Sequence, residues 1–344
     1  MMRSTVYQQL TVSHSTSKMA NLETIFELII GALGSVGNLL VCISIIRAKF
    51  MHNITNYILL SLAIADFLVC LNLLVFNQFT LDVWGADFQP SSDLVGEVFC
   101  QLFDDKILVW CSSKTSVMHL ACVAIERYVA IVQPLQYKRC FTVPRLLVLF
   151  VSMWLISLLW QLPYMLTPDY NAETKQCNNP RTSTFSQVFF IVTNSLFIVI
   201  PSICTLWCYW KILRCLRSSA QTFLKNNNRG PAFELLFACR KVVQTLFIVY
   251  VAFIILWFPN LILGIIYSLS TFRATPSIDI AFKLMAFSNS VVNPFIYGFK
   301  YRQLRKAFKL TVIPCCFKVQ VDPRAASNPF ELSALQRGTN NCTS

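Results

Sequence analysis

The chain is poor in charged residues and in histidine. Only 13% of its 344 residues are Asp, Glu, Lys or Arg, whereas a typical soluble domain carries about 25%. It has only three histidines, and none stands at the spacing of metal ligands. These shortages argue against a soluble fold and against an enzyme that depends on a metal or nucleophile cluster.

Charge is missing altogether from four long stretches, which are residues 28–46, 146–168, 182–210 and 242–272. Three more stretches are apolar with a few isolated charges, namely 57–80, 107–133 and 278–299. A helix needs about 20 apolar residues to cross a bilayer, whereas the strands of a membrane barrel are shorter and alternate in polarity. The sequence therefore predicts an all-α fold, a bundle of seven transmembrane helices.

The seven stretches form one membrane domain without internal repeats. We expect an unstructured polar tail at 1–21, the membrane domain at 22–310 and a flexible cytoplasmic tail at 311–344. The break in helical structure between the fifth and sixth spans is predicted at an NNNRGP segment.

A short basic and apolar segment, residues 299–309, follows the seventh span. Its periodicity predicts a helix on the membrane surface, with Phe299, Leu304 and Phe308 facing lipid. A simple positive stop signal is the alternative. Cys315 and Cys316 lie just beyond this segment, either as a palmitoylation pair or as two free thiols.

Positive charge is concentrated on one side of the predicted membrane. If the N-terminus is extracellular, the segments 47–56, 134–145, 211–241 and 300–344 are cytoplasmic and hold 20 of the 29 Lys and Arg. Membrane proteins keep such loops in the cytoplasm. The net charge of +13 therefore indicates orientation and requires no nucleic acid partner.

Each span also carries polar, aromatic or proline residues in a recurring arrangement. In chain order they are Gly37-Asn38, Asp66, Glu126-Arg127-Tyr128 with Pro134-Leu135, Trp154 with Pro163, Pro201 with Tyr209, Phe253 with Trp257-Phe258-Pro259, and Asn289 with Asn293-Pro294-Phe295-Ile296-Tyr297. Together, in this order, they resemble the rhodopsin-like G-protein-coupled receptors over about residues 35–310, and most of all the neuropeptide receptor group. The resemblance implies a plasma-membrane receptor with an extracellular N-terminus and ligand. It also implies a heterotrimeric G protein, and arrestin, as cytoplasmic partners.

The resemblance also assigns roles to the buried polar residues. Asp66 and its oxygen-bearing neighbours resemble the family's sodium pocket; those neighbours are Asn38, Ser116, Asn289 and Asn293. Hard oxygen ligands suit a small hard cation, but a protonated Asp66 in a helix-packing network is the alternative.

Arg127 resembles the arginine that the family releases on activation. Glu126 is its expected resting partner, and a simple snorkelling arginine is the alternative. The remaining coupling and switch positions are Tyr128, Leu135, Tyr209, Asn293, Pro294 and Tyr297. The positions expected to repack as the sixth helix moves are Val117, Pro201, Phe253, Trp257 and Pro259.

The chain departs from the family pattern in two places. Cys100, the expected disulfide partner of Cys177, lies 27 residues before Arg127, two more than is usual, which predicts a bulge in the third helix. Cys239 stands where the sixth helix commonly has an acid. This predicts a weaker resting restraint and raised basal signalling.

The ligand class is less well determined by the sequence. Amine receptors of this family carry an acid where this chain has Val109, and opsins carry a lysine where it has Phe287. Biogenic amines and retinal are therefore disfavoured as ligands. An acidic outer rim that includes Asp104, Asp105 and Asp279 favours a cationic peptide, unless it is merely a solvated surface.

Three lysines face the same region. Lys283 has a possible local partner in Asp279, and Lys106 is close to Asp104 and Asp105. Lys114 lies deep in the third span, where it could bind a ligand carboxylate or hydrogen-bond elsewhere. A small anionic or lipid-derived ligand is therefore the alternative to a peptide, and a secondary transporter is the alternative to a receptor.

Overall fold

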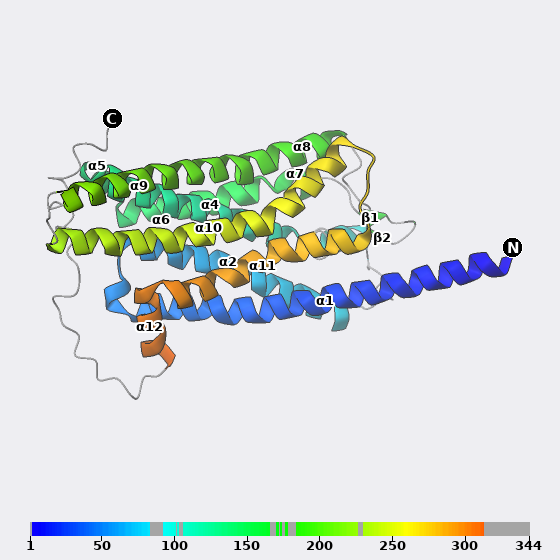
Figure 1. The fold of residues 1–344 in the computed structure, drawn as a ribbon. Helices are drawn as coiled ribbons and strands as arrows, with labels where there is room; N and C mark the ends of the chain where they lie inside the picture. Colours follow the sequence, from blue (N-terminus) through cyan, green and yellow to red (C-terminus); the bar gives the residue numbers. More distant parts are fainter. Residues whose placement is uncertain are drawn as a thin grey trace.

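The computed structural model describes residues 2–82, 92–100, 102, 106–165, 170–171, 173, 176–177, 184–225 and 230–312. Seven long helical segments lie side by side in one bundle (Figure 1). They are α1 (Met2–Arg47), α2 (Ile54–Asp82), α4 (Ile107–Val132), α6 (Val143–Leu159), the run α8 (Thr184–Asn194), η4 (Ser195–Val199) and α9 (Ile200–Lys225), α10 (Pro231–Leu269) and α11 (Pro276–Lys300). Because α4 packs against α2, α6, α9 and α10, it lies at the centre. The predicted all-α bundle is confirmed.

Shorter elements connect the long helices. They are η1 (Lys49–Met51), α3 (Asp93–Phe99), α5 (Pro134–Cys140), α7 (Leu162–Met165), the strands β1 (Tyr170–Asn171) and β2 (Gln176–Cys177), and α12 (Arg302–Val312). The two strands pair antiparallel, with Tyr170 opposite Cys177. Proline stands in the first turn of α5, α6, α10 and α11, where a missing backbone donor costs nothing.

The outer faces of the helices are apolar, as expected for a bundle dissolved in lipid. On α6, the large apolar side chains Leu147, Val148 and Val151 are all exposed. Among the described residues, five helices are long and apolar enough to cross a bilayer, and the bent pair α5 and α6 makes six if it is one span. α6 alone has 17 residues, and α11 is a helix of 25 residues that buries the polar side chains of Asn289, Ser290 and Asn293.

Close helix contact in lipid depends on small residues and packing. Gly34 illustrates this on α1, because a Cβ atom at this position would overlap the sulfur of Cys70 on α2. The many contacts between α1 and α2 depend on that approach.

Prolines and one unusual backbone conformation interrupt the helices where the sequence predicts distortion. The π-helical segment η4 ends two residues before Pro201, and α6 ends four residues before Pro163. The third span is divided into α3 and α4, and Lys106 between them adopts a left-handed conformation with φ 52°. Lys106 lies between Cys100 and Arg127, where the two extra residues predict a bulge.

Two expectations about the ends of the membrane domain differ from the structure. α1 begins at Met2 rather than after an unstructured tail, although its apolar part is Leu22–Arg47. Leu304 on α12 is fully buried, whereas Phe299 is 75% exposed. Leu304 therefore packs into the bundle core instead of facing lipid, because α12 lies against α1 and α11. Cys315 and Cys316 lie outside the described residues.

Candidate functional site

The buried carboxylate of Asp66 is the centre of a polar cluster between α2, α4 and α11. It is fully buried. Ser116 donates to its Oδ1 at 2.7 Å, Ser290 donates to the same oxygen at 2.9 Å, and Asn293 donates to Oδ2 at 2.7 Å. The structure thus brings together Asp66, Ser116 and Asn293 from the predicted set and adds Ser290.

Two amide oxygens of the same cluster have no donor. Asn289 Oδ1 and Asn293 Oδ1 are buried without a hydrogen-bond partner among the described residues. A buried acceptor without a partner is costly, so such an atom calls for an explanation. Asn38 is oriented differently, since its Nδ2 donates to the backbone oxygens of Gly34 at 2.9 Å and Ser290 at 2.8 Å.

A second buried carboxylate, Glu126, organises one end of the bundle. Its Oε2 accepts from Arg127 Nε at 2.6 Å, and its Oε1 accepts from Arg127 Nη2 at 2.6 Å, forming a bidentate ion pair. Thr55 on α2 donates to Oε1 at 3.1 Å and also contacts the Arg127 guanidinium. Tyr137 on α5 donates to Oε1 at 2.7 Å. We call these four residues the arginine cluster and this end of the bundle the arginine end.

Tyr137 is a neutral donor in this cluster. It lies on α5, outside the spans, where burial raises the pKa of its hydroxyl and the Glu126 carboxylate raises it further. On the same short helix, Leu135 is 83% exposed. α5 therefore carries one residue that restrains the cluster and another that is accessible to a partner.

The predicted activation partners of the arginine lie elsewhere in this structure. Tyr209 and Tyr297 are both buried, and neither hydroxyl hydrogen-bonds Arg127 within the described part of the chain. The Tyr209 ring packs edge-on against Phe247 of α10 at 5.5 Å. The Tyr297 hydroxyl has no hydrogen-bond partner among the residues described.

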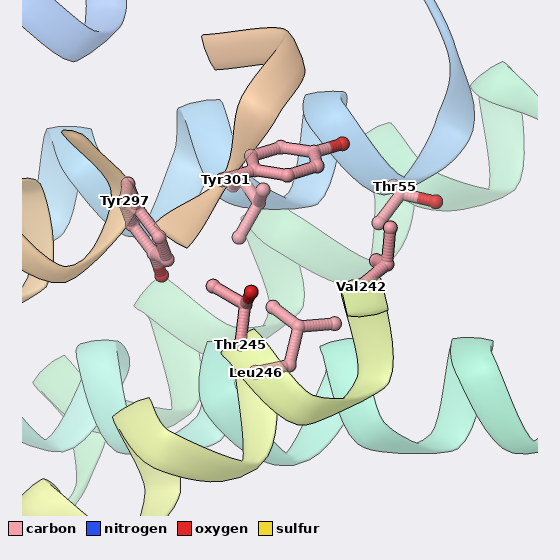
Figure 2. A pocket seen from close by; sticks show the side chains of 7 residues that line it. Thr55, Val242, Thr245, Leu246, Tyr297 and Tyr301 are labelled. Carbon is pink, nitrogen blue, oxygen red and sulfur yellow. The ribbon is translucent and has the colours of Figure 1, made fainter. Parts of the chain in front are cut away.

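A cleft opens beside the arginine cluster between α2, α10 and α11. Its empty space amounts to about 210 Å³, open solvent included, and it is too narrow to hold a water molecule. The cleft is lined by Thr55, Leu59, Val242, Thr245, Leu246, Tyr297 and Tyr301. Figure 2 shows Tyr297 and Tyr301 facing Thr245 and Leu246 across it. Because α10 forms one wall, movement of α10 would change the width of this cleft.

Two of the predicted repacking residues, Phe253 and Trp257, belong to an aromatic column along α10 with Phe247 and Tyr250. Trp257 packs 6.2 Å from Phe253 and 6.2 Å from Trp110 of α4. Val117 belongs to the same core cluster. Pro259 lies inside α10 just beyond Trp257, where it removes a backbone hydrogen bond and permits bending.

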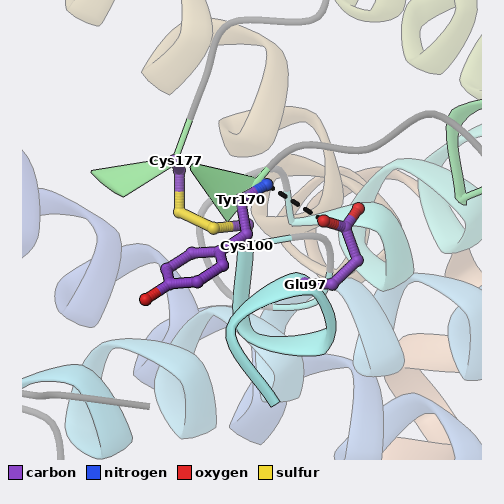
Figure 3. Close-up of a disulfide and its surroundings, with 4 residues drawn as sticks. All are labelled: Glu97, Cys100, Tyr170 and Cys177. Carbon is purple, nitrogen blue, oxygen red and sulfur yellow. Dashed lines mark hydrogen bonds between the residues drawn. A yellow bond between two sulfur atoms is a disulfide. The ribbon is translucent and has the colours of Figure 1, made fainter. Parts of the chain in front are cut away.

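The strand hairpin lies at the opposite end of the bundle. We call this end the disulfide end. Cys100 and Cys177 form the predicted bridge, which is therefore confirmed. Figure 3 shows the Tyr170 amide of β1 donating to the Glu97 carboxylate of α3, at 3.0 Å. The Tyr170 ring lies so close to Gly96 that a Cβ atom there would overlap it.

Two lysines at the disulfide end pair with glutamates of α1. Lys106 Nζ lies 2.5 Å from Glu27 Oε2, with side-chain exposures of 16% and 1%. Lys283 pairs with Glu23, and the side chains of these two residues are 32% and 19% exposed. The partner expected for Lys283 was Asp279, but that carboxylate accepts from Tyr267 at 3.0 Å instead. Asp104 and Asp105 lie outside the described residues.

Lys114 is buried deeper in the same half. Its ammonium donates to Gln161 Oε1 at 2.8 Å and lies 5.9 Å from the centre of the Phe197 ring. Val109 is fully buried in an apolar cluster with Phe287. An aliphatic side chain at this position cannot pair with an ammonium ion.

A model of the 7 transmembrane receptor (rhodopsin family) matches residues 37–297. The chain belongs to this family. It is a multi-pass membrane receptor rather than an enzyme, and this membership decides against the transporter.

Similar proteins in the family are named for amines. Octopamine receptor beta-1R of Drosophila melanogaster is 30% identical over 80% of this chain and 58% of its own length. Trace amine-associated receptor 9 of Homo sapiens is 27% identical over 81% of each chain. Octopamine receptor beta-2R of Chilo suppressalis is 28% identical over 94% of this chain and 86% of its own. These relatives do not support the predicted likeness to neuropeptide receptors.

Several residues of these sites had no signal that could have been read from the sequence. Ser290 and Thr55 are hydroxyl residues in apolar spans, and such residues usually bond their own helix. Tyr137 could have been found, because it lies three residues after Pro134, which belongs to the arrangement already identified in the sequence. Glu27 lies one residue before the first charge-free stretch. Because the spans were predicted from charge-free stretches, Glu27 was not counted as part of a span.

Proposed function

We propose that this receptor binds an extracellular peptide at its disulfide end and activates a heterotrimeric G protein at its arginine end, through movement of α10. The disulfide end and the N-terminus would be extracellular, and the arginine end cytoplasmic, in the plasma membrane. The observation that carries the signalling half is the arginine cluster beside the cleft. It holds Arg127 through α2, α4 and α5, and so leaves α10 able to move.

The G protein would enter the cleft that α10 widens. Opening would separate Val242 and Leu246 from Thr55 and allow Arg127 to exchange Glu126 for Tyr209, Tyr297 or the G protein. Leu135, exposed on α5, would add an apolar contact outside the cleft. Arrestin would use the same end of the bundle.

The hairpin at the disulfide end supports a peptide ligand. Its two short strands are held by the disulfide and by Glu97, and in the described structure they form a sheet of two strands only. A sheet edge can pair with an extended peptide through main-chain hydrogen bonds. An amine is disfavoured despite the names of the relatives, because Val109 offers no charge.

A small anionic or lipid-derived ligand is the second candidate. The buried Lys114 ammonium, positioned by Gln161 and Phe197, favours it. A carboxylate that reached Lys114 in this poorly solvated site would form a strong charge-assisted hydrogen bond. Lys106 and Lys283 are weaker candidates because Glu27 and Glu23 already neutralise them.

A ligand library, with peptides first, tests the proposal in cells that carry a promiscuous G protein. With an active compound, the potency of the wild type is compared with Lys114→Gln and with the double variant Asp104→Asn/Asp105→Asn. A peptide should lose about tenfold in potency on Asp104→Asn/Asp105→Asn, and an anionic ligand about tenfold on Lys114→Gln. Lys283→Gln is the matched control, because its lysine is paired at the same end. A peptide that is unaffected by the acidic variant would contradict the proposal.

We also propose that a sodium ion binds beside Asp66. The donor set fits, since Asp66 and Ser116 supply hard oxygens and two buried amide oxygens, of Asn289 and Asn293, have no donor in the described structure. A bound cation would supply the charge that a buried carboxylate needs. Asn38 would support the site through Ser290 rather than bind the ion.

A further inference from the structure

One face of α9 carries two tryptophans and two basic residues. Trp207, Trp210, Lys211 and Arg214 are spaced at i, i+3, i+4 and i+7, so they share one side of the helix. The Arg214 guanidinium lies 4.5 Å from the centre of the Trp210 ring. Lys211 Nζ lies 5.4 Å from Trp210 and 6.0 Å from Trp207. We call these four residues the tryptophan–cation stripe.

The stripe faces away from the bundle at the level where the membrane core ends. Trp207 and Trp210 are 46% and 47% exposed, and α9 runs along the outside of the bundle beside α4 (Figure 1). Residues 182–210 contain no charge, and Lys211 is the first charged residue after them. Tryptophan prefers the boundary between hydrocarbon and headgroups, so the stripe lies at that boundary.

The two cations of the stripe have no anionic partner of their own. Neither Lys211 nor Arg214 forms an ion pair or a side-chain hydrogen bond with any residue that the structure describes. A guanidinium stacked on an indole ring keeps its N–H donors directed outward in one plane, in the geometry that matches a phosphate. The rings therefore hold two phosphate-binding groups in place at little entropic cost.

We propose that the tryptophan–cation stripe binds the anionic headgroup of a membrane phospholipid. The phosphate would lie against Arg214 and Lys211, and the acyl chains would run along the exposed apolar residues Ile203 and Leu206. The assignment of this lipid to the cytoplasmic leaflet rests on the proposed orientation of the receptor in the membrane. The binding of the lipid to the stripe does not depend on that orientation.

The lipid would also lie next to the switch. The Trp207 ring packs 5.0 Å from the ring of Tyr128, which directly follows Arg127. A headgroup that immobilises Trp207 would therefore restrict Tyr128 as well. The site is thus placed to connect lipid composition with the arginine cluster.

Native mass spectrometry of the full chain in detergent tests this proposal. The receptor is titrated with dioctanoyl phosphatidylserine, phosphatidylinositol 4,5-bisphosphate and phosphatidylcholine. We expect anionic lipids to bind about tenfold more tightly than phosphatidylcholine, and Lys211→Gln/Arg214→Gln to remove most of that preference. Equal binding of both anionic lipids would identify the shared phosphate, and binding of the inositol lipid alone would identify its additional phosphates.

The matched control is Arg139→Gln/Arg145→Gln. It removes the same charge from exposed residues near the arginine end that have no ring contact in the described structure, so the preference should remain. Trp210→Leu should weaken binding while keeping both cations, and an unchanged thermal unfolding midpoint shows that each variant is folded.

Three results would overturn the proposal. One is equal losses in the two double variants, which would indicate diffuse charge attraction. Another is full retention of the lipid preference in Lys211→Gln/Arg214→Gln. The third is a loss of self-association in light scattering without a loss of lipid, which would assign the stripe to contact with a second copy of the chain.

Discussion

The two ends of the bundle hold their buried charges in different ways. At the arginine end, one carboxylate accepts from Arg127, Thr55 and Tyr137, and the ion pair joins neighbouring residues of a single helix. At the disulfide end, two separate pairs each join α1 to another helix, through Glu27 with Lys106 and Glu23 with Lys283.

This difference separates signalling from stability. The ion pair within α4 can break without moving two helices apart, so the arginine cluster can act as a switch. Breaking either pair at the disulfide end would release α1 from α4 or α11. Substitutions at the disulfide end should therefore change stability most, and those at the arginine end should change signalling most.

Glu27→Gln should have the largest effect of the substitutions at the disulfide end. It leaves the Lys106 ammonium nearly buried without its carboxylate, which should lower the free energy of unfolding by about 3 kcal/mol. Thermal unfolding in detergent measures the loss, and basal signalling per surface receptor should not change. Glu23→Gln is the control, since its more exposed pair should contribute less than about 1 kcal/mol. A larger loss in Glu23→Gln would contradict the comparison.

Glu126→Gln should have the largest effect on signalling. It removes the charge that holds Arg127, and a charge-assisted hydrogen bond of about 2 kcal/mol corresponds to a rise of roughly thirtyfold in basal activity. Guanine-nucleotide exchange at matched surface expression measures this rise. Unchanged basal exchange would show that Glu126 does not restrain the receptor.

Asp66→Asn tests whether the middle of the bundle connects the two ends. With wild type, exchanging sodium for a large organic cation at constant ionic strength should change agonist affinity by about fivefold or more. With Asp66→Asn the affinity should not respond, because the amide carries no charge to balance the ion. Ser35→Ala, which alters a buried hydroxyl of α1 with no partner in the described structure, is the control. A sodium response retained in Asp66→Asn would reject the site.

Thr55→Val and Tyr137→Phe sharpen the description of the arginine cluster. Each removes the hydrogen bond from a neutral hydroxyl to the Glu126 carboxylate and little volume, and Thr55→Val also removes the contact with Arg127. Because Arg127 still holds Glu126, each should raise basal exchange by about threefold, as expected for about 0.7 kcal/mol. The double variant should be roughly additive only if the two hydroxyls act independently. A fall in basal exchange would show that these residues serve the active state instead.

Cys239→Glu should have the smallest effect, in the opposite direction. A glutamate at this position of α10 would offer Arg127 a second acidic partner and lower basal exchange by about twofold, the effect of a partly solvated pair. Cys239→Gln, which adds a similar side chain without charge, is the control. No drop in Cys239→Glu relative to wild type would mean that the arginine cluster already suffices.

Much of the fold could be predicted because lipid imposes a simple rule. A span needs about 20 mostly apolar residues with few charges, so hydropathy predicts the seven helices. Asp66 and Arg127 could also be predicted as functional, because charged residues inside spans are rare and costly.

The partners of these residues could not be predicted in the same way. Thr55 and Glu126 lie 71 positions apart, and Ser290 and Asp66 lie 224 apart. Such contacts depend on helix rotation and crossing, which hydropathy does not determine. The expectation that Lys283 would pair with Asp279 came from helical spacing alone, but α1 places Glu23 closer.

The aromatic column on α10 has a thermodynamic consequence. Within the described chain, no ion pair connects α10 to α4. Rings of the column contact neighbouring helices instead, Phe247 and Tyr250 against Tyr209 of α9 and Trp257 against Trp110 of α4. Outward movement would expose the apolar lining of the cleft, including Leu59 and Leu246, to water. Exposure of apolar surface raises heat capacity. The free-energy difference between resting and active receptor should therefore depend on temperature along a curve. Basal activity should be lowest at one particular temperature.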